Sequence, residues 1–409
     1  MNTDPIGPSP LLQTIAITPT EIWNDSCAVG ELEYAIANGA TGATSNPSLV
    51  LEVLRNEPET WRRRAQELYA TFPTSTEADI SWWIAEEIAV RGAGLLEPIF
   101  EQTGGRQGRL SIQVNPVLYR DAPAMVEQAV HFAGLVPNLQ VKLPVTVAGL
   151  LAIEEATAQG ITINATVNFT VAGAIAVAEA VERGLARRAA EGHDTTGIHP
   201  VCTLMAGRLE DWLKVACERD GVLVAPGRME WAGVAVFKRA YGLYRTRGYR
   251  TRLLSGAFRN HLPWSQLIGG DIILTIPPAW QRLLNASTLE VRSRIDEPVD
   301  EAILAELHAS IPDFRRAYEP DGLSPHELAG YGASVRTMRQ FIAAYHDLQA
   351  QVRDFVLPDP GRKVPRPAQD RTGPGGIPAG PSGRHPGDHN TVATGRVHGL
   401  DADPSLRLA

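Results

Sequence analysis

Short apolar runs alternate with helix-like segments along most of this chain of 409 residues. Eight runs have the length and composition of buried strands, at residues 21–24, 42–44, 110–114, 139–143, 162–167, 199–205, 251–254 and 271–276. Helical spacing of apolar residues marks the segments 123–133, 147–158, 171–188 and 231–245. Because strands that alternate with helices pair in parallel, and eight of them can close into a ring, the alternation predicts a (β/α)8 barrel.

The main alternative for such an alternation is an open, doubly wound sheet that binds a nucleotide. Neither a Gly-x-Gly-x-x-Gly segment after the first predicted strand nor a Walker-type phosphate loop occurs in the sequence. No internal repeat of solenoid length is present either. The closed barrel is therefore the fold that the pattern favours.

The two ends of the chain differ in composition from its middle. Residues 357–409 are dense in proline, glycine, arginine, aspartate and histidine, and offer too little apolar surface to offset the entropy of ordering. We predict that this tail is disordered and that residues 1–14 are flexible for the same reason. Residues 15–356 are then left for a single barrel domain.

Charge and composition limit the kind of partner. The net charge is −8 and the isoelectric point about 5.7, which argues against nucleic acid or an anionic membrane surface. No apolar stretch approaches the roughly 18–20 residues that span a bilayer, and the first ten residues do not resemble a secretory signal. The three cysteines form neither an even disulfide framework nor a metal-type spacing. We therefore expect a cytoplasmic protein whose partner is a small anion met by local arginines.

Lys142 is the most informative single residue. It is the first of only four lysines, and it lies within the apolar run 139–143, whereas arginine supplies nearly all other positive charge. A buried lysine loses its proton and becomes an amine nucleophile, which arginine does not. One interpretation is Schiff-base chemistry with a carbonyl substrate; the other is a lysine at a strand edge whose ammonium group reaches solvent.

Polar residues follow most of the predicted strands. In (β/α)8 barrels the chemistry lies where the strands end, so these residues are expected to meet at one rim. They are Asp25, Thr44, Ser45, Asn46, Gln113, Asn115, Lys142, Asn164, Thr166, Asn168, Arg208, Arg259, Asn260 and Thr275.

In this order, the segments resemble those of the class I transaldolase family. The matching stretches are residues 43–49, which contain Thr-Ser-Asn-Pro-Ser-Leu, 141–146 around Lys142, 160–166, which read Gly-Ile-Thr-Ile-Asn-Ala-Thr, 192–208, 256–260 and 275–278. Residues 321–348 are similar to the closing helices of that family, so the resemblance covers roughly residues 20–355. It implies a barrel of the class I aldolase/transaldolase type with extra C-terminal helices.

The resemblance also implies catalytic roles. Lys142 would attack the carbonyl of a ketose and form an imine, and Asp25 would take a hydroxyl proton as the carbon–carbon bond breaks. Thr166 would hold the water that relays protons. Gln113 occupies the position of the family's acid–base glutamate, where an amide positions a water but exchanges no proton near neutral pH.

Substrate binding is implied for a second set of residues. Ser45, Asn46 and Asn164 would orient the substrate, while Arg208 and Arg259 would bind its phosphate, which suits the fork of a guanidinium group. The partners would be sugar phosphates, no metal or organic cofactor would be needed, and we expect a monomer or a homodimer.

Several positions depart from the family pattern. Gln113 and Asn115 stand where the third strand usually ends in Glu-Val-Asp. Fructose-6-phosphate aldolases also carry glutamine there, but pair it with a tyrosine on the sixth strand, and that position is Met205 here. Ala257 replaces a serine of the phosphate loop, and Asn168 replaces an apolar residue.

Three functions are therefore open. The first is a transaldolase of the pentose phosphate pathway, which transfers a dihydroxyacetone unit between sugar phosphates. The second is a ketose-phosphate aldolase or a variant of specialised metabolism, and the third is a sugar-phosphate-binding barrel of low activity.

The site residues also have purely structural interpretations. Asp25 could cap the helix that follows it, Asn46 could belong to a turn with the next proline, and Thr166 could be an ordinary strand threonine. Arg208 and Arg259 could be surface arginines in an arginine-rich chain.

Overall fold

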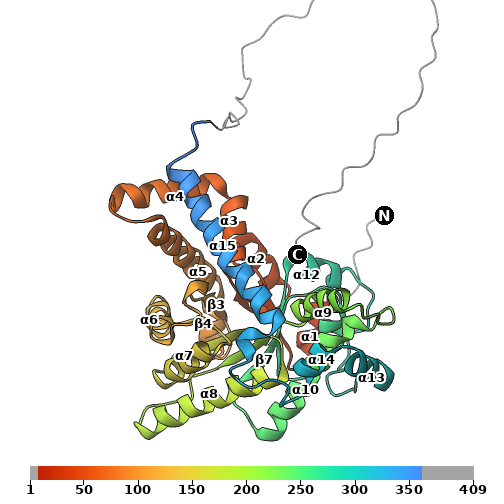
Figure 1. Ribbon diagram of the computed structural model, residues 1–409. Coiled ribbons are helices and arrows are strands. Elements are labelled where there is room, and N and C mark those ends of the chain that lie inside the picture. Colours follow the sequence, from red (N-terminus) through yellow and green to blue (C-terminus); the bar gives the residue numbers. More distant parts are fainter. Residues whose placement is uncertain (1–7, 362–409) are drawn as a thin grey trace, which may run out of the picture. The chain divides into compact units, whose positions relative to one another are not determined.

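Eight parallel strands close into a barrel in chain order in the computed structural model, which describes residues 8–361 (Figure 1). The strands are β1 (Glu21–Asn24), β2 (Ala40–Thr44), β3 (Arg109–Gln113), β4 (Leu139–Pro144), β5 (Ile163–Asn168), β6 (Val201–Leu204), β7 (Arg252–Ser255) and β8 (Ile273–Ile276). Pairing of β1 with β8 closes the ring. The predicted (β/α)8 barrel is confirmed.

Helices cover the outer face of the barrel. They are α1 (Pro10–Ile17), α2 (Val29–Ala37), α3 (Pro47–Asn56), α4 (Pro58–Thr71), α5 (Glu77–Gln102), α6 (Ala122–Ala133), α7 (Val147–Ala158), α8 (Val171–Ala190), α9 (Ala206–Asp220), α10 (Ala232–Arg247), α11 (Leu262–Ser265), α12 (Pro278–Asn285), α13 (Glu301–Ser310), α14 (Pro312–Tyr318) and α15 (Gly332–Val356). Three short 3-10 turns, η1 (Pro116–Leu118), η2 (Met229–Trp231) and η3 (Leu328–Gly330), complete the elements of the described part.

The sixth strand is shorter than predicted. We expected residues 199–205, whereas β6 is Val201–Leu204. Pro200 precedes it and has no N–H group to give to a strand ladder, so regular pairing begins one residue later. Met205 already stands at the N-cap of α9, which ends the strand.

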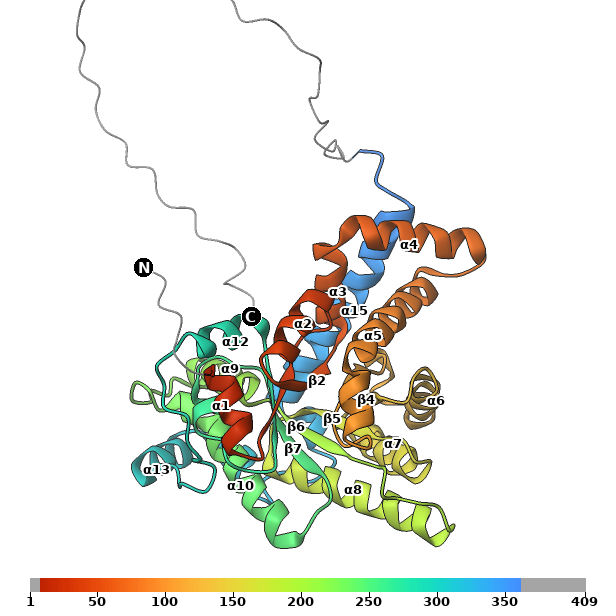
Figure 2. The same cartoon turned by 180° about the vertical axis from the view of Figure 1, so that it is seen from behind.

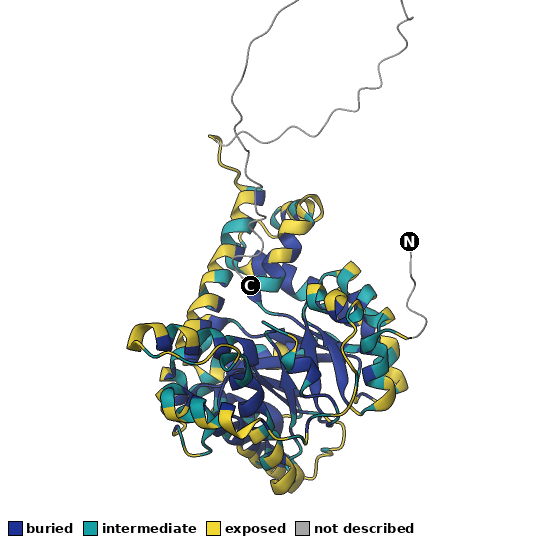
Figure 3. Ribbon diagram, turned by 90° about the vertical axis from the view of Figure 1, so that its right-hand side faces the viewer, coloured by how far each residue is buried: buried dark blue, intermediate teal, exposed yellow. Residues whose placement is uncertain are grey.

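Side chains fill the inside of the barrel, so the barrel is a packed core and no pore. Trp23, Val201, Leu254 and Ile273 form a buried cluster of their own. A Cβ atom on Gly42 would lie 2.5 Å from the Trp23 ring, so only glycine leaves room for this indole. Figure 3 shows the strands as the most buried layer, with exposed residues on the outward faces of the helices.

A second core lies in a helical extension built by α3, α4, α5 and α15. Trp61 and Leu68 of α4, Ile84 of α5, and Leu348 and Phe355 of α15 are buried in one cluster. Figure 2 shows α15 running beside α3, from the barrel into the helical extension. Extra C-terminal helices are thus present, and α15 connects the extension to the barrel.

The chain joins the fold earlier than residue 15. Helix α1 begins at Pro10 and buries Leu11 and Thr14, so the expected flexibility of residues 1–14 is wrong for its last five residues. Trp264 Nε1 donates to Thr14 Oγ1 at 3.1 Å, which ties α1 to α11. Residues 1–7 and 362–409 lie outside the described residues. The second range contains most of the tail, residues 357–409, that was predicted to be disordered.

Candidate active site at the carboxyl-terminal rim

Lys142 lies near the end of β4, at the carboxyl-terminal rim, by which we mean the end of the barrel at which the strands end. Its side chain is buried, with the residue 5% exposed, and Nζ donates to the carbonyl oxygen of Ser45 at 3.2 Å. Strand pairing sets it beside Gln113 on β3 and Asn164 on β5. The interpretation in which the ammonium group reaches solvent is therefore wrong.

The surroundings of Lys142 favour a neutral amine. Burial lowers its pKa to about 8, against the opposing effect of the carboxylate of Asp25. Arg208 contributes a smaller lowering because it is a like charge. The free amine, which is the nucleophilic form, is therefore well populated at a pH slightly above neutral.

Asp25 follows β1 and faces the same rim. Its Oδ1 accepts a hydrogen bond from Thr44 Oγ1 at 2.7 Å, and Thr44 in turn contacts Thr275 Oγ1 at 2.8 Å. Burial raises the pKa of Asp25, while Lys142 and the bond from Thr44 hold it down. The N-cap of α2 is Ala28, so Asp25 does not cap that helix.

Gln113 ends β3 and is 4% exposed. Its Oε1 is buried and has no hydrogen-bond partner among residues 8–361. Together with Ser45 and Asn46 it lines a small cavity that Trp82 and Tyr345 close from the side of the helical extension. A buried, unsatisfied acceptor costs about 1–3 kcal/mol unless a ligand or water supplies a donor.

Asn46 and Ser45 are partly engaged in structural contacts. Asn46 caps α3, since its Oδ1 accepts from the backbone nitrogens of Ser48 at 2.9 Å and Leu49 at 3.2 Å. Its amide NH2 group has no hydrogen-bond partner among residues 8–361. The Ser45 hydroxyl donates to Cys27 Sγ at 3.6 Å, so Ser45 meets Lys142 through its backbone carbonyl.

Asn164 and Thr166 lie on β5 and are fully buried. Asn164 donates to Ser111 Oγ at 3.1 Å and accepts from Thr203 Oγ1 at 2.7 Å, so both ends of its amide are held inside the barrel. Thr166 Oγ1 has no hydrogen-bond partner among the described residues. Directly after it, Val167 has φ of 58°, which is strained for a β-branched residue.

Arg208 lies in the first turn of α9, and α15 holds its side chain. Nη1 donates to Gln340 Oε1, and the guanidinium group lies 5.1 Å from the centre of the Phe341 ring. Burial, and next the like charge of Arg259, lower the pKa of Arg208 to about 10. Both arginines also lower the pKa of Asp25, which is consistent with their position at the same rim.

Arg259 lies in the loop between β7 and α11. Its Nη2 lies 2.9 Å from Asp211 Oδ2, and Nε donates to both oxygens of that carboxylate at 3.1 Å. Ala257, two residues earlier, has φ of 63°, a left-handed conformation unusual for alanine. Neither Arg208 nor Arg259 is an ordinary exposed arginine, because each is partly buried and held by a named partner.

Two departures from the expected pattern have local structural partners. Asn168 Nδ2 donates to Cys202 Sγ at 3.4 Å, and its Oδ1 accepts from the backbone nitrogen of Thr170 at 3.3 Å. Met205 is buried at the start of α9, where its backbone nitrogen donates to the carbonyl of Asn168 at 3.0 Å. The amide at position 168 therefore shapes the junction between β5 and α8.

Several supporting residues follow no pattern that could be recognised in the sequence. Thr44 and Thr275 were expected at the rim, but not as the hydrogen-bonded pair that holds Asp25. Gln340 and Asp211, which hold the two arginines, lie on helices and follow no recognisable motif. Within residues 8–361, no group of three or more histidine, cysteine, aspartate or glutamate side chains is arranged to hold a metal ion.

The fold and the rim define a (β/α)8 barrel with a buried lysine near the end of the fourth strand, opposite a carboxylate and two arginines. The sequence profile of the family described as Transaldolase/Fructose-6-phosphate aldolase matches residues 22–322. The chain belongs to this family.

Named relatives agree with this assignment. The chain is 32% identical over 241 residues to Transaldolase 1 of Streptomyces avermitilis, which covers 57% of this chain and 63% of that protein. It is 30% identical over 245 residues to the transaldolase of Mycobacterium marinum, covering 58% and 65%, and 30% identical over 259 residues to Transaldolase 1 of Streptomyces coelicolor, covering 61% and 67%. The matches thus span about two thirds of each relative's length, just under that in the first two.

Proposed function

We propose that this protein is a transaldolase-like enzyme that transfers a three-carbon dihydroxyacetone unit between sugar phosphates through an imine on Lys142. The observation that carries the proposal is the buried amine of Lys142, whose pKa falls to about 8 at the rim that also holds Asp25. Membership of the family and the names of the relatives support the same reaction.

The first step is the formation of the imine. The Nζ lone pair of Lys142 attacks C2 of a ketose phosphate, the carbon–nitrogen bond forms, and the former carbonyl oxygen leaves as water after taking up protons. Thr166 Oγ1, which is buried and unpartnered among residues 8–361, is suited to hold that water. Gln113 Oε1 is a second acceptor for it, on the other side of Lys142.

The second step is cleavage between C3 and C4 of the bound sugar. Asp25 takes the proton of the C4 hydroxyl, the C3–C4 electron pair moves toward the iminium nitrogen, and an aldose phosphate leaves. Thr44 fixes the carboxylate by its 2.7 Å hydrogen bond. The enamine that stays on Lys142 then attacks an acceptor aldose phosphate, Asp25 returns its proton, and hydrolysis of the new imine releases the product.

The two arginines bind the phosphate of the substrate. Arg208 and Arg259 are like charges close enough for Arg259 to lower the pKa of Arg208, and an anion between them relieves this repulsion. Gln340 is a neutral partner for Arg208, so it leaves the charge of that guanidinium group available. Asn46, through its free NH2 group, completes the recognition of sugar hydroxyls.

Asn164 is proposed to act from below the substrate. It neighbours Lys142 in the strand pairing, and both ends of its amide are held by Ser111 and Thr203. A side chain fixed in this way keeps the lysine and the imine in one orientation. Ser45 contributes its backbone carbonyl to the same task.

The partners in this proposal are sugar phosphates, and the place of action is the cytoplasm, where such charged metabolites are retained by the cost of crossing a bilayer. Among residues 8–361, no helix is both long and apolar enough to cross a membrane. A monomer or a homodimer is expected, and light scattering of the purified chain distinguishes them.

A ketose-phosphate aldolase is the second candidate, and Gln113 is the observation that favours it. Gln113 lies beside Lys142, and its amide cannot exchange the proton that the family's glutamate supplies. The loss of this proton transfer is expected to affect a transferase and a lyase to different extents. A lyase releases dihydroxyacetone without an acceptor, whereas a transferase needs one.

The test is a measurement of aldose phosphate release from fructose 6-phosphate with and without an aldose phosphate acceptor. Release that depends on the acceptor, with formation of a new ketose phosphate, is expected. Release of free dihydroxyacetone at the same rate without acceptor would indicate the lyase, and binding without release under both conditions would indicate a sugar-phosphate-binding barrel.

A further inference from the structure

Helix α9 holds the loop that carries Arg259. A Cβ atom on Gly207, in the first turn of α9, would lie 1.7 Å from the carbonyl oxygen of Ala257, so only glycine allows the loop to approach this closely. One turn further along, Asp211 contacts Arg259 itself. The proposed reaction uses Arg259 to bind phosphate but assigns no role to Asp211.

Two neighbouring carboxylates of α9 face this loop, and their contacts differ. Glu210 is buried, accepts from Asn260 Nδ2 at 3.0 Å, and is paired with Lys214 Nζ at 2.6 Å. Asp211 has no such lysine. Among residues 8–361, its carboxylate makes hydrogen bonds and ion pairs with Arg259 only. Asp211 is thus the dedicated partner of one rim arginine.

The hydrogen bonds of Arg259 use three of its five N–H groups, of which a guanidinium group has one on Nε and two on each terminal nitrogen. The Nε group donates to the carboxylate of Asp211 at 3.1 Å, and Nη2 donates to its Oδ2 at 2.9 Å. Nη1 donates to the carbonyl oxygen of Phe258 at 3.0 Å. Each terminal nitrogen therefore keeps one N–H group, and such a pair suits two oxygens of a phosphate.

The charge of Asp211 acts on both rim arginines. Burial, and next the like charge of Arg259, lower the pKa of Arg208, whereas the carboxylates of Asp25 and Asp211 raise it. Two roles for Asp211 follow, with opposite effects on binding. In the first it holds Arg259 in place for the phosphate, and in the second it competes with the phosphate for Arg259.

The exposure of the pair favours the first role. The side chain of Asp211 is 32% exposed and that of Arg259 is 22% exposed, so solvent screens the attraction between them. A screened carboxylate is a weak competitor for a phosphate dianion. An arginine side chain that is already held in place loses less conformational entropy when it binds a ligand.

We propose that Asp211 is a positioning residue for the substrate phosphate, because it fixes Arg259 with one N–H group on each terminal nitrogen left to bind that phosphate. The inference rests on the proposed function, in which Arg208 and Arg259 bind the phosphate of a ketose. Ala257 increases the need for such positioning, since the loop carries an alanine where the family has a serine hydroxyl.

The test measures KM and kcat of the full chain on fructose 6-phosphate and on unphosphorylated fructose. Asp211→Ala is expected to raise KM for fructose 6-phosphate about five- to tenfold, the effect of one hydrogen bond to a charged group, while kcat stays near the wild-type value. KM for fructose is expected to change little. Equal increases for both sugars would overturn the proposal, since they would indicate a general effect on the structure of the site.

Asp211→Asn separates the effect of position from the effect of charge. The amide keeps an oxygen that accepts from Arg259 but loses the negative charge. Positioning predicts a KM for fructose 6-phosphate between those of the wild type and Asp211→Ala. Competition instead predicts that this KM falls in both variants, which would contradict the proposal.

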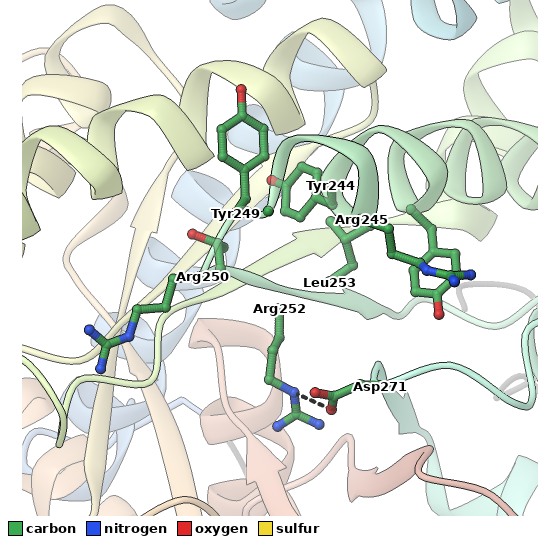
Figure 4. Close-up of a pocket in the computed structure, with 10 residues that line it drawn as sticks. Tyr244, Arg245, Tyr249, Arg250, Arg252, Leu253 and Asp271 are labelled. Carbon is green, nitrogen blue, oxygen red and sulfur yellow. Dashed lines mark ion pairs between the residues drawn. The ribbon is translucent and has the colours of Figure 1, made fainter.

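The matched control is an aspartate that contacts an arginine at the opposite end of the barrel. Arg252 begins β7, and its Nε lies 2.9 Å from Asp271 Oδ1. Figure 4 shows this ion pair beside a cavity. Asp271→Ala removes a partner of an arginine Nε, as Asp211→Ala does, and KM for fructose 6-phosphate is expected to stay at the wild-type value.

Calorimetric titration with inorganic phosphate makes the same comparison without any chemistry on Lys142. The dissociation constant is expected to rise in Asp211→Ala by the same factor as KM and to be unchanged in Asp271→Ala. A wild type that binds phosphate no more tightly than Asp211→Ala would overturn this proposal alone. A wild type that binds neither phosphate nor fructose 6-phosphate would overturn the phosphate site of the proposed function as well.

Discussion

Gln113 and Lys142 are neighbours in the parallel pairing of β3 with β4, and the Oε1 atom of Gln113 is buried without a hydrogen-bond partner among residues 8–361. An acceptor that cannot change its protonation state thus lies beside the amine proposed to form the imine. This arrangement makes proton transfer, and not imine formation, the step at which this chain is expected to differ from its relatives.

Replacement of Gln113 by glutamate is expected to speed turnover. General acid–base groups contribute about 10²- to 10⁴-fold to rates, so recovery of even part of the relay gives an increase of about tenfold or more. The measurement is kcat on fructose 6-phosphate with an aldose phosphate acceptor. Gln113→Leu, which removes the acceptor, is the control and is expected to be slower than the wild type. An unchanged or lower rate in Gln113→Glu would instead identify Gln113 as an adaptation to another ketose.

Formation of the imine is expected to rise with pH, with a midpoint near the value of about 8 to which burial lowers the pKa of Lys142. The neutral amine is the reactive form, so the rate of trapping increases as the pH passes upward through this pKa. Asp25→Asn removes the carboxylate that raises the pKa of Lys142, so its midpoint is expected at a lower pH. A midpoint that shifts upward in Asp25→Asn would contradict the electrostatic effect of Asp25 on Lys142.

Lys238 is the matched control for this titration. Lys238 lies on α10, away from the rim, and burial also lowers its pKa to about 8. Its Nζ donates to the carbonyls of Arg294 at 2.7 Å and Glu297 at 2.6 Å. Lys238→Arg is therefore expected to keep the trapping that Lys142→Arg loses. Equal loss of trapping in both variants would contradict the assignment of the imine to Lys142 alone.

Removal of either rim arginine is expected to affect phosphorylated substrates selectively. Hydrogen bonds to charged groups contribute about 1.5–3 kcal/mol, so Arg208→Ala or Arg259→Ala should raise KM for ketose phosphates by roughly ten- to a hundredfold. The KM of an unphosphorylated ketose should change little. Equal losses for both substrates would show that the arginines support the structure of the site.

Gln340 is expected to act through Arg208. Gln340→Ala removes the acceptor that α15 offers to the Arg208 guanidinium group, and one such hydrogen bond is worth about 0.5–1.5 kcal/mol. KM for ketose phosphates should rise by several-fold while kcat stays near the wild-type value. Gln349→Ala removes a hydrogen bond from Gln349 to Tyr345 on the same helix and serves as the control. A change in KM as large in Gln349→Ala would indicate a general effect on α15.

Asn46 is expected to show two separable roles. Asn46→Ala loses the cap of α3 and should cost about 1 kcal/mol of unfolding free energy as well as activity. Asn46→Asp keeps an oxygen for the cap but loses the NH2 donor, so stability should persist while activity falls. Thermal unfolding and kcat/KM of both variants check this, and a fully active Asn46→Asp would exclude the amide as a substrate donor.

The regular alternation of strand-like and helix-like segments made the barrel predictable. Contacts between residues far apart in the sequence were not predictable. The position of Lys142 follows from an apolar run closed by Pro144, and burial of that run is a local property of the sequence. The bond from Arg208 to Gln340 joins residues 132 positions apart, and only the packing of α15 brings them together. The same holds for residues 10–14, which were expected to be flexible but belong to α1, where Leu11 and Thr14 are buried.

Borohydride trapping with fructose 6-phosphate, followed by intact mass and peptide mapping, tests most directly whether Lys142 forms the imine. We expect one covalent adduct per chain, mapped to Lys142, absent in Lys142→Arg and retained in Lys238→Arg. An adduct that maps to Lys214 or Lys238, or that persists in Lys142→Arg, would show that Lys142 is not the reactive amine, as would the absence of any adduct in a folded wild-type protein.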